Sequence, residues 1–276
     1  MPVSIASIFG NVSAAVFQQL VNWLYPPTAP FAQPNGLRLK WLTTTAVALL
    51  GGQAQSAASQ NVIVTPGVNI NLAVNGAGGL DLGVLAAAKS YAVWLLQGAS
   101  GTTAVASLSF NYAGVTVPAG YTAEYRCVGS FVSDPAVARV NEFRQSGDGA
   151  TRRIHGPWSG NQKAINVGHS LVSAPVDCSP FVPPTATMVK CNIQGAPNAA
   201  PGATNIIMWA PSGYNLGAYQ YTDYITIPDG PAFDAQSSLD WVPLDAAKQF
   251  VYRCVQYVGA SVPNATISVV GYEEEL

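Results

Sequence analysis

The sequence predicts an all-β protein, built as a sandwich or a jelly-roll-like antiparallel domain. Short apolar segments typical of strands recur along the chain, and clusters rich in Gly, Pro, Asn and Ser separate them. No helical periodicity of useful length follows about residue 90. Many short strands at near-regular spacing are typical of β-sandwiches and barrels.

Two segments carry the clearest strand signals. Residues 68–75 alternate apolar and polar, so Val68, Ile70, Leu72 and Val74 are expected on one face. Residues 91–96 are continuously apolar, which predicts a strand covered on both faces. Further strands are expected at 104–110, 121–132, 188–193, 205–209, 219–227, 250–258 and 265–270.

The first part of the chain has a different pattern. Apolar residues at helical spacing over 5–24 predict a helix, which Tyr25-Pro26-Pro27 ends before a proline-rich extended arm. We therefore divide the chain into an arm, residues 1–59, and a β-sandwich domain, residues 60–276. The β-sandwich domain is expected either to be one unit or to consist of two sub-layers that separate near residues 150–165. The helix either docks on a neighbouring chain or packs on its own domain.

Composition indicates extensive burial between chains. Charged residues make up 9% of the sequence, against about 25% in an average globular protein, and 49% of residues are apolar. The most apolar N-terminal stretch, residues 3–24, is interrupted by Ser, Asn and Gln, so no membrane insertion is expected. We expect a homo-oligomer that buries much of its surface in an assembly.

Charge and cysteine usage exclude further classes. The net charge is −2 and Arg152-Arg153 is the one adjacent basic pair, which argues against a nucleic-acid partner. Four cysteines and two histidines show no zinc-ligand spacing, so no metal site is expected. Tyr-Arg-Cys-Val occurs twice, at 125–128 and 252–255. If the two copies form adjacent strands, Cys127 and Cys254 come close.

Catalytic constellations are absent from the pattern. There is no Gly-x-Ser-x-Gly elbow and no phosphate-binding glycine loop with a lysine. His155 and His169 fall in segments expected to be loops or turns, and no spacing brings two carboxylates together. We expect no catalytic residues, no cofactor and no enzyme activity.

Aromatic and amide side chains offer a candidate binding surface, because Tyr and Trp combine large contact area with polar ends. A host-surface glycan or a pilus subunit is one ligand for it; filling the core or a subunit interface is the alternative. The residues are His155, Trp158, Asn161, Tyr214, Tyr219, Tyr221 and Tyr224.

Several short segments follow one another in an order that is found in a known protein family. They are Gly-Gly-Leu-Asp at 78–81, Tyr-Ala-Val-Trp-Leu at 91–95, Pro-Ala-Gly-Tyr-Thr at 118–122, and Val-Pro-Pro-Thr-Ala at 182–186. Together with Gly271-Tyr272, this order resembles a domain of tail-fibre and related virion proteins of tailed bacteriophages, over residues 60 to 272.

The resemblance implies a non-enzymatic virion protein of the tail fibre or baseplate that acts in assembly and host-cell attachment. It also implies a homotrimer, assembled in the host cytoplasm. Residues 1–35 have no counterpart in the family, and their uncharged composition predicts that they contact other virion proteins. A capsid decoration protein is the alternative, and a glycan-degrading tailspike is a third.

Overall fold

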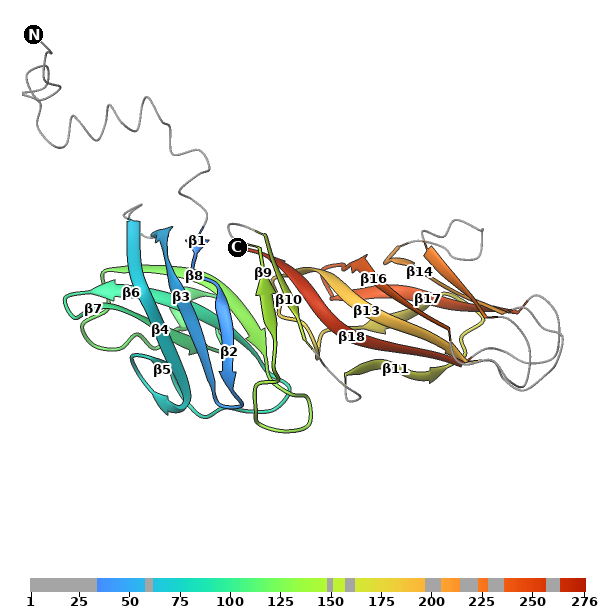
Figure 1. The fold of residues 1–276 in the computed structure, drawn as a ribbon, viewed down its shortest axis with the longest axis horizontal. Helices are drawn as coiled ribbons and strands as arrows, with labels where there is room; N and C mark the ends of the chain where they lie inside the picture. Colours follow the sequence, from blue (N-terminus) through green and yellow to red (C-terminus); the bar gives the residue numbers. More distant parts are fainter. Residues whose placement is uncertain are drawn as a thin grey trace, which may run out of the picture.

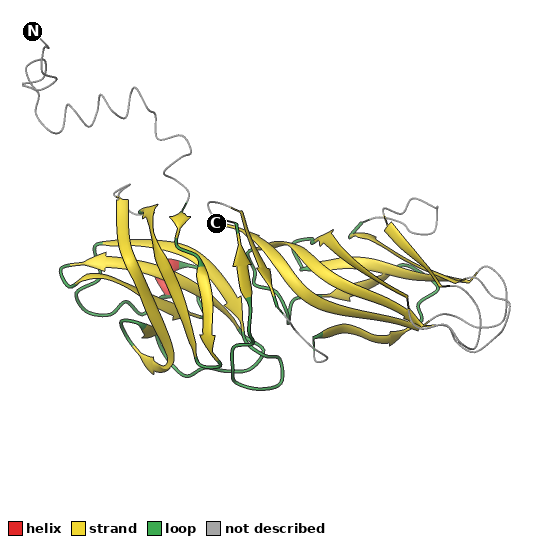
Figure 2. Ribbon diagram, viewed as in Figure 1, coloured by secondary structure: helices red, strands yellow, loops and turns green. Residues whose placement is uncertain are grey.

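The computed structural model describes residues 34–57, 62–147, 151–156, 162–196, 205–213, 223–227, 236–256 and 264–276. These residues confirm the all-β prediction, since they form eighteen strands and one short 3-10 turn, η1 (Tyr112–Gly114). Figure 2 shows strands throughout the described part of the chain. The expected N-terminal helix lies outside the described residues.

The strands form two lobes, with β9 (Arg144–Ser146) between them (Figure 1). The N-lobe contains β1 (Asn35–Gly36), β2 (Leu39–Thr43), β3 (Ala46–Gln55), β4 (Val62–Asn75), β5 (Gly79–Leu80), β6 (Ser90–Gly98), β7 (Gly101–Ser107) and β8 (Glu124–Val132). The C-lobe contains β10 (Thr151–His155), β11 (Lys163–Gly168), β12 (Ala174–Asp177), β13 (Ala186–Ala196), β14 (Asn205–Pro211), β15 (Asp223–Ile227), β16 (Gln236–Pro243), β17 (Gln249–Gln256) and β18 (Asn264–Glu275).

One fourteen-stranded sheet runs through both lobes. Its main path is β16-β13-β18-β10-β9-β2-β3-β4-β5-β7-β6-β8, with β1 on β3 and β11 on β18. The sheet folds back on itself at β5, so β2-β3-β4 and β7-β6-β8 face each other and their strands run in different directions (Figure 1). Both pairings of β5 are parallel. The sheet is therefore mixed, where a wholly antiparallel one was expected.

The central strand of the N-lobe, β6, has apolar neighbours on both faces, as its continuous apolar run predicts. Tyr91, Val93 and Leu95 belong to the main core. The alternating residues Ala92, Trp94 and Leu96 form a second cluster, covered by aromatic and valine side chains from residues 110–127. Such two-sided burial explains why this strand lacks the polar alternation of a half-exposed strand.

The strand expected at 68–75 exists and is longer than expected. Ile70 and Leu72 are buried in β4, whereas Val74 is 49% exposed at the end of the strand. The small and polar residues of 51–60 predict a linker, but β3 continues through Gly51 and Gly52 to residue 55. Gly52 lies so close to the backbone of β1 that a Cβ there would overlap it. The expected boundary at 59/60 thus falls between two paired strands.

The C-lobe packs the strands around β13 and β18 against a four-stranded sheet of order β12-β17-β14-β15. Its central strand β14 repeats the arrangement of β6: Ile207 and Trp209 enter the main core, while Met208 and Ala210 form a separate cluster. Each lobe therefore pairs a doubly buried strand with a Tyr-Arg-Cys-Val strand, β8 or β17. Because β8 and β17 belong to different sheets, Cys127 and Cys254 are not on adjacent strands, and both are free thiols.

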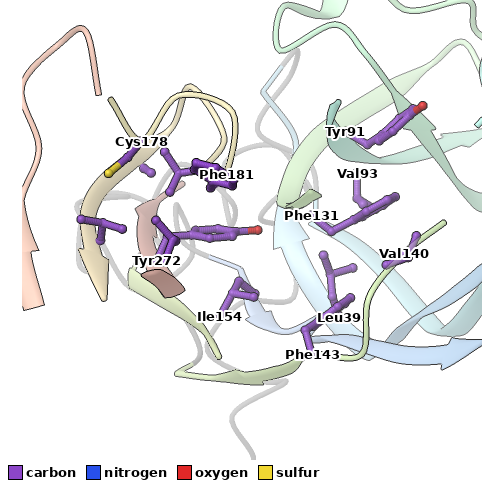
Figure 3. Packing of buried hydrophobic residues seen from close by; sticks show 14 of the residues in the cluster. Leu39, Tyr91, Val93, Phe131, Val140, Phe143, Ile154, Cys178, Phe181 and Tyr272 are labelled. Carbon is purple, nitrogen blue, oxygen red and sulfur yellow. The ribbon is translucent and has the colours of Figure 1, made fainter. Parts of the chain in front are cut away.

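The two lobes share one hydrophobic core. A single cluster of buried residues extends from Leu39 and Phe131 in the N-lobe to Ile154, Phe181 and Tyr272 in the C-lobe. Figure 3 shows the side chain of Tyr272 between Phe181 and Ile154, with its hydroxyl directed toward the N-lobe. Burial that is continuous across the junction favours one cooperative body over two independent domains.

A buried polar group closes this junction, and we call it the interlobe node. The N–H of Ser130 in β8 donates to Glu274 Oε1 at 3.0 Å, and the Ser130 hydroxyl donates to Glu274 Oε2 at 2.5 Å. The Tyr272 hydroxyl donates to the Ser130 carbonyl at 3.0 Å, and Thr185 Oγ1 donates to Glu274 Oε2 at 3.0 Å. Side chains of β18 thus satisfy backbone groups at the free edge of β8.

Arg152 supplies the positive charge of the interlobe node. Its side chain is fully buried, and its guanidinium donates to the carbonyls of Leu37 and Gly36 in the N-lobe. Arg152 stands directly opposite Glu274 across the β10–β18 pair, where its charge favours the ionised carboxylate. A buried charge is tolerated where it is both paired and hydrogen-bonded.

We expect Glu274 to make stability fall as pH rises. Burial raises the pKa of this carboxyl above its ordinary value, although hydrogen bonds from Ser130 and Thr185 and the charge of Arg152 oppose the shift. The folded protein therefore binds more protons than the unfolded chain between the two pKa values, and its free energy of unfolding declines across that range. Relative to Glu274→Gln, the wild type should be most stable at the acid end in denaturant titrations. A difference that is constant with pH would contradict this.

A double-mutant cycle should detect the coupling of Arg152 to Glu274. Arg152→Met leaves a buried carboxylate and two carbonyls without their cation, which should cost about 3–5 kcal/mol of unfolding free energy. Arg152→Met combined with Glu274→Gln should cost less than the sum of the single changes, since the uncompensated charge is gone. Additive losses in urea denaturation would show that the two groups are independent.

Candidate functional site

The structure describes two of the seven residues of the predicted binding surface. His155 ends β10 in the large sheet, not in a loop as expected, and Tyr224 lies in β15, 51% exposed at the edge of the four-stranded sheet. The two residues are on strands of different sheets, so they do not form one surface by strand pairing. The remaining five lie outside the described residues: Trp158, Asn161, Tyr214, Tyr219 and Tyr221.

His155 belongs to a row of side chains that crosses the large sheet. Successive strands place these residues directly opposite one another, and such residues project from the same face of a sheet. We call this set, together with Arg153 two residues before His155, the cationic row. From β2 to β16 its directly paired members are Lys40, Arg144, His155, Gly271, Lys190 and Trp241.

Trp241 organises one end of the cationic row. The His155 ring meets the indole edge-on, with ring centroids 5.6 Å apart. The guanidinium carbon of Arg153 lies 5.4 Å from the ring centroid and the Lys190 Nζ lies 5.7 Å from it. Both distances are within the range of cation–π attraction. Gly271 stands between His155 and Lys190 in the sheet, where a Cβ would overlap the Ile154 carbonyl oxygen. The Trp241 ring therefore packs near His155, Arg153 and Lys190 across a position that carries no side chain.

Charge on this face is mainly positive. Four of the chain's 12 Lys and Arg residues lie in the cationic row, and Lys40 and Arg144 are exposed. Glu273 and Glu275 alternate with the inward Glu274 and face the same side as the row. Glu273 Oε2 accepts from Arg153 Nε at 2.6 Å, which orients a guanidinium whose side chain is 53% exposed.

The surroundings of His155 disfavour the protonated form of its imidazole. Burial lowers the pKa of His155, and the nearby positive charges of Lys190 and Arg153 lower it further. Its Nε2 is 3.3 Å from the Ser146 hydroxyl in β9. A neutral imidazole has one donor and one acceptor nitrogen, so this residue is suited to hydrogen bonding on the face rather than to adding a positive charge.

A cleft lies between the lobes. Its volume is about 510 Å³, and it is lined from the N-lobe by Lys89, Leu108 and Phe110 and from the C-lobe by Val182 and Lys248. Lys248 Nζ donates to the Ala186 carbonyl at 2.8 Å, so this ammonium group already has a protein partner. The cleft exists only because the lobes pack together, and sequence reasoning had no signal for it.

The described residues hold no constellation for catalysis by a metal or a reactive thiol. No group of three or more His, Cys, Asp or Glu in that part of the chain is arranged to bind a metal ion. Burial raises the pKa of Cys127 to about 11 and that of Cys254 to about 12, which keeps both thiols protonated and unreactive near neutral pH. Within the same residues, no helix has the length and apolarity to cross a membrane.

Sequence reasoning missed most of the cationic row. Lys40, Arg144, Lys190 and Trp241 are far apart along the chain and carry no local motif. The one available signal was the pair Arg152-Arg153, since alternation within a strand directs one member into the core and the other to the surface. Which distant residues share the outer face depends on strand order.

Comparisons with known proteins assign no family. No family model and no curated protein matches the chain. Among solved structures, the chain is similar to a crystal structure of the infectious bursal disease virus VP2 subviral particle, with 10% identity over 93% of this chain and 77% of that one. The TM-score is 0.23, and a likeness at that level supports no conclusion about fold or function.

Lys190→Gln should raise the pKa of His155 toward its ordinary value. The substitution removes one of the two positive charges that disfavour the imidazolium, while burial and Arg153 remain. Following the ring protons by NMR across an acid-to-neutral titration gives the pKa directly. The control is Arg126→Gln, which removes one positive charge from β8, in the opposite layer of the N-lobe. An unchanged His155 titration in Lys190→Gln would show that the lysine does not act on the ring.

Proposed function

We propose that this chain is a non-enzymatic structural protein of a virion, of the tail-fibre or baseplate type, acting in assembly and host-cell attachment. The observation that carries the proposal is an open, uncharged sheet edge on a two-lobed β body with one continuous core. The low proportion of charged residues, 9%, supports the proposal, because uncharged surface is available for contact between subunits.

The open edge is the first half of β4, and we call it the β4 edge. Residues 62–68 pair with β3 on one side, whereas β5 pairs with β4 only at Asn71 and Asn75. Within the described part of the chain, no strand pairs with the other side of residues 62–68. Val62 and Val64 on this stretch are 46% and 60% exposed, and no charged residue occurs between them and Asn75.

The edges of β8 and β4 differ in a way that favours pairing at β4. The edge of β8 is occupied where Glu274 and Tyr272 bind the backbone of Ser130. A strand edge left open with apolar side chains is a template for another chain, and soluble monomers usually protect it with charged residues, prolines or bulges. The β4 edge has no charged residue and one proline, Pro66. We infer that a second copy of this chain covers the β4 edge in the assembly.

The segments that carry the phage resemblance support a structural role. The Pro118–Tyr121 turn is closed by a hydrogen bond of 3.2 Å from the Tyr121 N–H to the Pro118 carbonyl, with Gly120 at φ +89°. Tyr91 and Trp94 are buried on opposite faces of β6. These residues specify turns and packing, so the proposal concerns a scaffold and not a catalytic centre.

A charge at the β4 edge should weaken self-association. Val64→Lys places an ammonium on a side chain that is 60% exposed, so the fold should persist while the association constant falls by about tenfold or more, or about 1.4 kcal/mol. Sedimentation over a range of concentrations measures the effect. Val172→Lys is the matched control, 70% exposed and outside the strands of the C-lobe. A wild type that stays monomeric, or equal association of both variants, would contradict the proposal.

Location tests the virion assignment itself. Gold-labelled antibody against the chain should decorate the tail or baseplate of intact particles, and purified chain should compete with particles for adsorption to host cells. Labelling of the head would instead support a capsid decoration protein. Absence of the chain from purified particles would end the virion proposal.

A further inference from the structure

We propose that the cationic row is a binding site for an acidic polysaccharide, a chain bearing carboxylate or sulfate groups. This inference deepens the proposed function, since it rests on the attachment role and names the ligand class. The ligand would lie across the strands, over the outer face that β2, β9, β10, β18, β13 and β16 share.

The geometry fits an extended ligand better than a single small ion. Neighbouring strands are about 4.8 Å apart, so the four steps from Lys40 to Lys190 cover about 19 Å. Arg144 and His155 lie between these ends, and the Trp241 ring lies beside His155 and Lys190 at the far end. Positive groups spread along one line match anionic groups that repeat along a chain.

The side chains of the row provide the contacts that an acidic sugar requires. Arg153 and Arg144 carry planar guanidinium groups, which bind carboxylates and other oxyanions through paired hydrogen bonds. Arg153 is held in place by Glu273 and lies over the Trp241 ring, so little conformational freedom is lost on binding. His155 adds a neutral donor or acceptor for hydroxyl groups, and the half-buried Trp241 adds flat apolar surface.

Nucleic acid fits this face less well. A nucleic-acid footprint is strongly basic, whereas this chain has a net charge of −2 and a pI near 5.6. Glu273 and Glu275 stand on the same side as the row, where they would repel a continuous phosphate backbone. Isolated cations interspersed with acidic and aromatic groups suit a ligand with fewer charges and many hydroxyls.

Binding of the full-length chain to defined probes tests the inference. Lightly sulfated dextran oligosaccharides, which bear sulfate and no carboxylate, and hyaluronan oligosaccharides, which bear carboxylate and no sulfate, are the acidic probes. Unmodified dextran and a single-stranded oligonucleotide are the neutral and nucleic-acid probes. At about 150 mM salt, where surface charges are screened beyond about 8 Å, at least one acidic sugar should bind. It should bind more tightly than the oligonucleotide, and unmodified dextran should not bind. Whichever of the two acidic sugars binds more tightly assigns sulfate or carboxylate.

Removing positive charges from the cationic row gives a second test. Arg144→Gln with Lys190→Gln should weaken binding of the acidic sugar at least tenfold and reduce its salt dependence. The matched control also removes two positive charges, through Arg126→Gln in β8 and Lys89→Gln in the interlobe cleft, and should retain wild-type affinity. Thermal melting of both double variants verifies that each is folded.

Three results would overturn the inference: no binding to either acidic sugar, tighter binding to the oligonucleotide, or an equal loss in the control variant. Failure here is distinguishable from failure of the proposed function. A chain found in the tail of purified particles that binds no acidic sugar retains its structural role and loses this site. A chain that binds the sugar and is absent from particles retains the site and loses the virion role.

Discussion

The structure depends on Arg152 and Glu274, two buried charged residues directly opposite each other on β10 and β18. Removing two charges from water is costly, and the attraction between them offsets that cost only when the remaining hydrogen-bonding groups are satisfied. Here Arg152 binds two carbonyls of the N-lobe, and Glu274 accepts hydrogen bonds from Ser130 and Thr185. These demands cannot be met by one lobe alone, so the interlobe node fixes one relative placement of the two.

The same strand pair creates the outer face. Alternation along β10 directs Arg152 inward and Arg153 outward, and alternation along β18 directs Glu274 inward and Glu273 outward. Locking the lobes therefore also aligns strands from both of them into one sheet, across which Lys40 and Lys190 belong to a single row. The register of β10 on β18 therefore determines both the contacts that hold the lobes together and the side chains that the outer face presents.

One strand edge of the N-lobe is bound by the C-lobe of the same chain, and another is open to a second chain. The interlobe node occupies the edge of β8 at Ser130, whereas the β4 edge has no strand partner over residues 62–68 within the described residues. An assembly that paired through β4 would keep the node intact, because the two edges belong to opposite layers. A chain with so few charges can thus build a stable subunit and still offer an uncharged surface for contact.

The sequence by itself determined the all-β class, the doubly covered strand at 91–96 and the alternating strand before Asn75, because these depend on local periodicity and turn residues. It misplaced the 51–60 segment, where Gly51 and Gly52 serve close strand approach and not a linker. Only the tertiary structure decided that Cys127 and Cys254 are in different sheets, that Arg152 meets Glu274, and that Arg144, His155 and Lys190 share a face. Those relations depend on strand order and register between distant segments, on which local pattern carries no information.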